Sequence, residues 1–247
     1  QFLVKSAIDL TATGLVYITG EKGHASDYVV GSAAGNTLQV CIVSPDASET
    51  RVLHSAVVTE LTLSMDAGTN GGRLRASGTI WSGFQPNVAT NAVTDGSTAS
   101  NTDFNQGLFD CHAIEIATTQ VTCKSFSFTI SHPAARVGFA ICNSNDAEPQ
   151  EYVRNRLEIT GSINVKMDDT SVAQQAFWLA GTSKAILVGD EGTSGGGSAT
   201  KIFFEFPTVK YTGHNVDLGS EDGVFIELPF TATATGSNKL MYLKLTN

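Results

Sequence analysis

The sequence predicts an all-β protein made of long antiparallel hairpins, with one short α-helix at about residues 170–180. Apolar and polar residues alternate with a period of two over most of the chain, glycine-rich turns separate the alternating runs, and one segment has helical spacing instead. The 247 residues are 41% hydrophobic and 16% charged, which suits a folded chain with a sizeable core. No shift in composition marks a boundary, so we expect one domain over residues 1–247.

The first long hairpin is expected at residues 57–80. Apolar side chains take one parity from Val57 to Met65, and the glycine-rich segment 68–72 forms the turn. The polar parity of the first strand is Glu60, Thr62, Ser64 and Asp66. The polar parity of the returning strand is Arg73, Arg75, Ser77 and Thr79.

A second hairpin repeats this pattern in residues 121–130 and 157–168. Three phenylalanine and isoleucine side chains alternate in the first strand with Ser125, Ser127 and Thr129. The second strand has the polar parity Glu158, Thr160, Ser162, Asn164, Lys166 and Asp168. Such a face is either a solvated sheet surface or the lining of an enclosed space.

One helix is predicted after the second hairpin. Val172, Ala176 and Leu179 recur at helical spacing, Asp169 or Thr170 suits the N-cap, and Gly181 suits the end. We expect the apolar stripe to close an apolar edge of the domain. Strands resume at 202–211, 224–234 and 239–246.

Residues 84–107 form the longest segment without periodicity, and are predicted to be a long inserted loop. The segment is polar and rich in turn residues, and Phe84, Phe104 and Leu108 are its expected apolar anchors. A loop of this length in a compact domain is usually functional or disordered.

Several chemistries are excluded by the composition. The net charge of −9 argues against binding nucleic acid through phosphate neutralisation, and no apolar run approaches the roughly 20 residues of a membrane span. The four cysteines have no Cys-x-x-Cys spacing, so we expect reduced core thiols and no zinc. Residues 192–196 match a nucleophile elbow, but a strand rather than a helix follows them. We expect no enzyme, no cofactor and no metal.

The second half of the chain resembles the phage tail tube protein family in five successive motifs. These are VTCKSFSFTI, the strand ITGSINVKMDD, the helix end FWLAGT with the strand AILV, FPTVKYTG and EDGVFIELPF. The last two contain the matching positions Pro207, Val209, Thr212, Gly213, Asp222, Gly223, Pro229 and Phe230. Residues 51–84 match the family's first hairpin more loosely, and His132 stands where the family has asparagine.

The resemblance implies a virion protein of a β-sandwich or partial-barrel fold with a flanking helix. Subunits of this family form rings, usually of six, which stack into a tube that conducts DNA, and the tube ends meet other tail proteins. The polar parities of both hairpins would then line the lumen, without gripping the DNA, and the loop 84–107 would order against the next ring. Assembly would take place in the host cytoplasm.

Two alternatives to a tail tube subunit remain at the level of the sequence. Another β-structural phage protein, such as a tail completion or capsid decoration protein, would share much of this pattern. A carbohydrate-binding β-sandwich, or a hydrolase built on one, is the second. A lectin would place aromatic residues on an exposed face, whereas the phenylalanines here lie mostly on the apolar parities.

Overall fold

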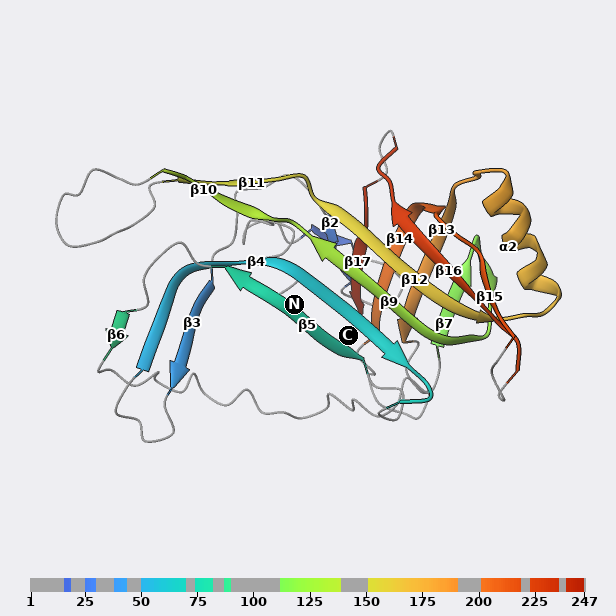
Figure 1. The fold of residues 1–247 in the computed structure, drawn as a ribbon, viewed down its shortest axis with the longest axis horizontal. Helices are drawn as coiled ribbons and strands as arrows, with labels where there is room; N and C mark the ends of the chain where they lie inside the picture. The colour runs from blue at the N-terminus through green and yellow to red at the C-terminus, as the bar shows by residue number, and fades with distance from the viewer. Residues whose placement is uncertain are drawn as a thin grey trace.

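The computed structural model describes residues 16–18, 25–29, 38–43, 50–69, 74–81, 87–89, 112–138, 151–190, 201–218, 223–235 and 239–246. Most of these residues lie in strands, and the described residues include one helix, between β12 and β13 (Figure 1). In the first half of the chain the strands are β1 (Val16–Ile18), β2 (Ala25–Val29), β3 (Leu38–Val43), β4 (Thr50–Asp66), β5 (Arg75–Trp81), β6 (Asn87–Ala89), β7 (His112–Ile116) and β8 (Thr119–Gln120). The remaining elements are β9 (Cys123–Ser131), β10 (Ala134–Gly138), β11 (Glu151–Arg154), β12 (Glu158–Lys166), α2 (Asp169–Leu179), β13 (Lys184–Asp190), β14 (Lys201–Tyr211), β15 (Asn215–Asp217), β16 (Phe225–Ala232) and β17 (Tyr242–Thr246).

The strands pair in one antiparallel sheet that folds over on itself, apart from the separate pair β10–β11. The sheet bends over along β14, which pairs with strands of both halves. Its first half pairs with β13 and β17, and residues 209–211 pair with β16. We call β5, β4, β9, β12, β16 and β15 the front sheet, and β7, β13, β14, β17, β2 and β1 the back sheet. The predicted antiparallel sandwich is thus confirmed, and the described strands leave it open rather than closed into a barrel.

Both predicted hairpins are present and lie side by side in the front sheet (Figure 1). β4 pairs with β5 in the first, β9 pairs with β12 in the second, and β4 also pairs with β9. β9 and β12 continue beyond the sandwich as the two-stranded extension β10–β11. Within the predicted loop 84–107 the structure describes only β6, whose residues 87–89 pair with residues 50–52 of β4. The loop anchors Phe84, Phe104 and Leu108 lie outside the described residues.

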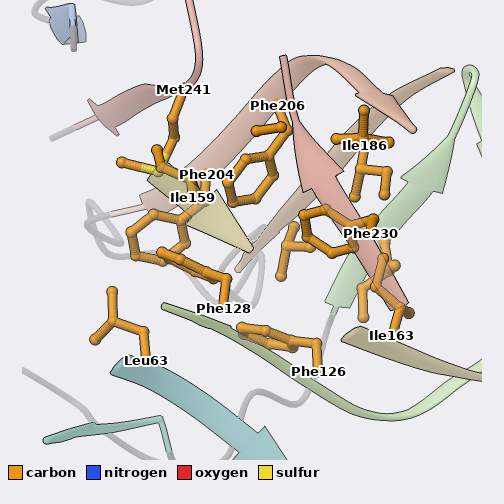
Figure 2. Close-up of a cluster of buried hydrophobic side chains, with 14 of the residues drawn as sticks. Leu63, Phe126, Phe128, Ile159, Ile163, Ile186, Phe204, Phe206, Phe230 and Met241 are labelled. Atoms are coloured by element: carbon orange, nitrogen blue, oxygen red, sulfur yellow. The ribbon is translucent and has the colours of Figure 1, made fainter. Parts of the chain in front are cut away.

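The core lies between the two sheets, and aromatic side chains fill its centre (Figure 2). Phe128 of the front sheet meets Phe204 and Phe206 of β14 edge to face, at centroid distances of 5.0 and 5.1 Å. Phe206 meets Phe230 in the same way at 5.4 Å. Edge-to-face pairs of this kind add about 0.5–1.5 kcal/mol beyond the burial of their area. The apolar parities predicted from the sequence therefore form the core.

Glycine at position 161 makes room for this aromatic cluster. Gly161 of β12 is paired with Phe128 on one side and with Phe230 on the other. A Cβ atom there would lie 2.5 Å from Cζ of Phe230 and 2.7 Å from the carbonyl oxygen of Ser127. The glycine thus lets an aromatic ring lie flat across the strand, which compensates for its missing side chain.

Helix α2 confirms the predicted helix, which begins at Asp169 and ends at Leu179. Gly181 adopts a left-handed φ of 60°, Thr182 N–H donates to the Phe177 carbonyl, and Gly181 N–H donates to the Trp178 carbonyl, both at 3.0 Å. This is the Schellman arrangement that glycine favours. The prediction that the apolar stripe closes the domain's own edge is wrong, because Val172 and Leu179 are 59% and 70% exposed.

Candidate functional site

The register of the front sheet gathers the polar parities of both hairpins onto one face. Residues directly opposite each other on antiparallel strands point to the same side. Ser64 of β4 is paired with Arg75 of β5 and with Ser127 of β9. Ser127 is paired in turn with Ser162 of β12. The same row-by-row matching holds one step along, where Thr62, Thr129 and Thr160 are neighbours.

We call this surface the polar face, and it contains nearly every residue that the sequence singled out. Its described polar members are Glu60, Thr62, Ser64, Asp66, Arg75, Ser77, Thr79, Ser125, Ser127, Thr129, Ser131, Glu158, Thr160, Ser162, Asn164, Lys166, Lys210, Asn215, Asp217, Glu227 and Thr231. On β16, Phe225 and Pro229 also lie on this side, opposite Lys166 and Ser162. Asp168 lies beyond the end of β12 and is exposed. Arg73 lies outside the described residues.

Sequence reasoning missed the contribution of β16 to the polar face. Glu227 is opposite Asn164, and Thr231 is opposite Thr160. The alternation of β16 contains the signal, since both residues take the parity opposite to Ile226 and Phe230. The alternation alone did not predict that β16 pairs with β12.

The centre of the polar face is hollowed. A depression of about 430 Å³ spans the face from Arg75 on β5 to Glu227 on β16. Hydroxyl groups line its floor, and they are half-buried because they shield one another. The floor residues are Ser64, Ser125, Ser127 and Ser162.

Hydrogen bonds between neighbouring strands hold these polar side chains in place. The hydroxyls of Thr62 and Thr129 are 2.8 Å apart across β4 and β9. Ser162 donates to Oε1 of Glu227 at 3.0 Å, and Asn215 donates to Oε2 of the same carboxylate at 3.2 Å. Such pairs fix the side chains close to the sheet and make the surface even.

The polar face is mildly acidic. Five carboxylates, Glu60, Asp66, Glu158, Asp217 and Glu227, stand against three cations, Arg75, Lys166 and Lys210, which leaves a net charge of two negatives. Asp66 uses Oδ1 to accept the N–H of Gly68 at 2.7 Å in the hairpin turn. Arg75 lies opposite Ser64, whereas Glu60 lies opposite Thr79.

The described residues of the polar face include no histidine and no cysteine. In the described ranges no three histidine, cysteine or acidic side chains gather in a way that would hold a metal ion. Cys123 has a free thiol, and burial raises its pKa from 9.0 to about 12, so it is a poor nucleophile at neutral pH. The other three cysteine side chains lie outside the described residues.

Both edges of the front sheet end in strands with one neighbour. β5 pairs only with β4, and β15 pairs only with β16, among the strands that the structure describes. A free edge presents unpaired backbone N–H and C=O groups, which favour pairing with a further strand. The polar face therefore lies on a sheet that has room to be extended at each side.

Comparison with known proteins gives one family. A family model described as phage tail tube protein matches residues 3–232, which is nearly the whole chain. No curated protein sequence matches the chain. Across the described residues, no helix combines the length and the apolar composition that a bilayer crossing requires.

Proposed function

The chain belongs to the phage tail tube protein family, a structural component of the virion tail, and we propose that it is the subunit of stacked rings forming a DNA conduit. The rings are hexameric, residues 1–247 act as one tail tube domain, and the polar face lines the lumen. The observation that supports this most strongly is the polar face that continues over five strands, on a sheet whose two edges have no further neighbour among the described strands.

The strand directions of the front sheet suit closure into a ring. Each neighbour in the order β5, β4, β9, β12, β16 and β15 is antiparallel to the last, so β5 and β15 run in opposite directions. A rotation about an axis roughly along the strands keeps those directions. The β5 strand of the next copy would therefore continue the sheet as an antiparallel neighbour, and closure would remove both free edges of the front sheet.

The chemistry of the polar face suits a channel through which DNA slides. Each lysine or arginine that neutralises a phosphate adds salt-dependent affinity, and on this face three cations are outnumbered by five carboxylates. Hydroxyl side chains make up most of the remainder and keep the wall hydrated. The subunit has no enzymatic role and no cofactor in this proposal. Its partners are further copies of itself and other tail proteins at the tube ends, and assembly occurs in the host cytoplasm.

The proposal is tested by following assembly with concentration. Purified full-length chain should form rings and stacked tubes, seen by negative-stain electron microscopy and by light scattering as the protein is concentrated. Substituting one serine of the polar face by alanine, as in Ser127→Ala, should leave assembly intact, since that side chain faces the lumen. A chain that stays monomeric at high micromolar concentration in native buffer would contradict the proposal.

A further inference from the structure

Helix α2 exposes an apolar side in the single subunit instead of packing that side on the domain. Val172, Ala176 and Leu179 lie on one side of the helix and are all exposed. The opposite side packs on the domain through Gln174, which is 3% exposed and accepts a hydrogen bond at 2.9 Å from Tyr211. An amphipathic helix ordinarily buries its apolar stripe. We call the exposed residues Val172, Ala176 and Leu179 the α2 stripe.

The opposite edge of the molecule has an exposed apolar strip of its own. On β5, Ala76, Gly78 and Ile80 are opposite the buried residues Leu63, Leu61 and Val58 of β4, so they point to the core side of the front sheet. They are nevertheless exposed, and Ile80 is 40% exposed, because the back sheet does not reach under β5. We call Ala76, Gly78 and Ile80 the β5 strip.

We propose that the α2 stripe of one subunit covers the β5 strip of the next copy in the ring. The inference rests on the proposed ring and names the surfaces that close it. Helix α2 flanks the β15–β16 side of the sandwich, where Trp178 stacks on His214 at 6.0 Å (Figure 1). A β5 strand added beyond that edge would bring its core side over the helix. The small side chains of Ala76 and Gly78 let a helix approach closely.

The charges at the two edges favour a second copy of this chain as the occupant. Arg75 opens β5, whereas Asp217 and Glu227 lie on β15 and β16 at the opposite edge. Within one subunit, four strand spacings of about 4.8 Å, roughly 19 Å along the sheet, separate Arg75 from Glu227. Head-to-tail contact between copies would bring these opposite charges together, whereas contact between like edges would place arginine against arginine or carboxylates against carboxylates.

Cross-linking tests the contact directly. Full-length Leu179→Cys/Ile80→Cys and Leu179→Cys/Ala76→Cys variants are assembled and treated with a short bis-maleimide. At least one pair should give a ladder of covalent oligomers up to the ring number in denaturing gels. Each single-cysteine variant controls for the native thiols, and Leu179→Cys/Val153→Cys controls for random collision, because Val153 on β11 is exposed but distant from α2.

Charge substitution gives a second readout. Leu179→Lys and Ile80→Lys should each keep the circular dichroism spectrum and the melting temperature of the dilute monomer, because both positions are exposed, but should raise the concentration needed for rings at least tenfold. The matched control Ala173→Lys adds the same charge to the flank of α2 and should change it less than twofold. Rings that form normally from both variants and give no ladder would overturn the contact while leaving the ring itself intact. If wild-type protein forms no rings, the proposed function fails instead.

Discussion

Replacing Gly161 by alanine should destabilise the subunit sharply. The added methyl group would point into the core, where Cζ and Cε1 of Phe230 lie 2.5 and 2.8 Å from the Cβ position and the Ser127 carbonyl oxygen lies 2.7 Å away. Carbon atoms in good contact are about 3.5–4.0 Å apart, so each overlap is about 1 Å. The Phe230 ring is held by Phe206, and the Ser127 oxygen belongs to the backbone of β9, so neither contact yields cheaply.

The free energy follows from these overlaps. Overpacking typically costs 1–3 kcal/mol and sometimes more, and two rigid clashes suggest about 4 kcal/mol. Burial of one methyl group returns about 0.8 kcal/mol, and the lower entropy of the unfolded alanine chain returns about 0.7 kcal/mol. The net loss is about 2.5 kcal/mol. For a chain of this size that corresponds to a fall in Tm of roughly 5–10 °C.

Thermal and urea unfolding of the dilute monomer, followed by circular dichroism, would measure this loss. The control Gly68→Ala places a methyl group in an exposed turn, 3.3 Å from a side-chain oxygen, and should change Tm by less than about 2 °C. In a Phe230→Leu background the ring atoms that clash are gone, so Gly161→Ala should cost about 1–2 kcal/mol less. A Gly161→Ala variant within 0.5 kcal/mol of wild type, or a cost unchanged by Phe230→Leu, would refute the reasoning.

Three further predictions concern the lumen and the buried titratable groups. The triple variant Ser64→Lys/Ser127→Lys/Ser162→Lys should assemble but slow DNA ejection, because three added cations would bind phosphate. The control Asn155→Lys/Gln175→Lys/Ser183→Lys adds the same charge off the polar face and should eject normally, so equal ejection rates would argue against a lumenal face. The free energy of unfolding should fall as the pH rises above about 9, because the Cys123 thiol then ionises in the unfolded chain but not in the folded protein, where its pKa is about 12. Burial also raises the pKa of Tyr211, which adds to the fall at high pH. Cys123→Ala should flatten this fall, and a slope identical to wild type in chemical denaturation across that range would count against it. Reductant should leave Tm unchanged, since we expect reduced thiols, and a drop of several degrees would reveal a structural disulfide.

Local patterns in the sequence predicted the strands and the polar face well. The alternation in β4, β5, β9 and β12 determined which side chains share a face, because the side-chain period of a strand is two. The helix was equally predictable from its spacing and from Gly181. These features depend on neighbours a few residues apart.

Long-range pairing could not be predicted in this way. Nothing local showed that β16 adds Glu227 to the polar face, because its partner β12 lies about 60 residues earlier. Proline is ordinarily found on edge strands or at strand ends, but Pro229 lies inside β16. The Pro229 carbonyl accepts the Thr212 N–H on the side of β16 that faces away from β12. On that side the neighbour of β16 changes from β15 to β14 at Pro229, so the N–H group that proline lacks is not needed for strand pairing there.

The exposed α2 stripe shows a different limit of sequence reasoning. Helical spacing indicated an apolar side but not what it packs against, and the single chain was assumed to be the unit that buries it. In the subunit it is Gln174 that is buried, while Leu179 is 70% exposed. If the assembled ring is the unit of burial, the pattern is consistent with the ordinary rule for amphipathic helices.

The orientation of the front sheet in assembled tubes is the central claim, and an electron cryo-microscopy reconstruction of those tubes tests it most directly. The account predicts a continuous antiparallel barrel around the channel, with Ser127 and Ser162 facing the lumen and the Phe128 side chain facing the subunit core. A reconstruction in which the polar face packs between subunits, or points to the outside of the tube, would contradict it.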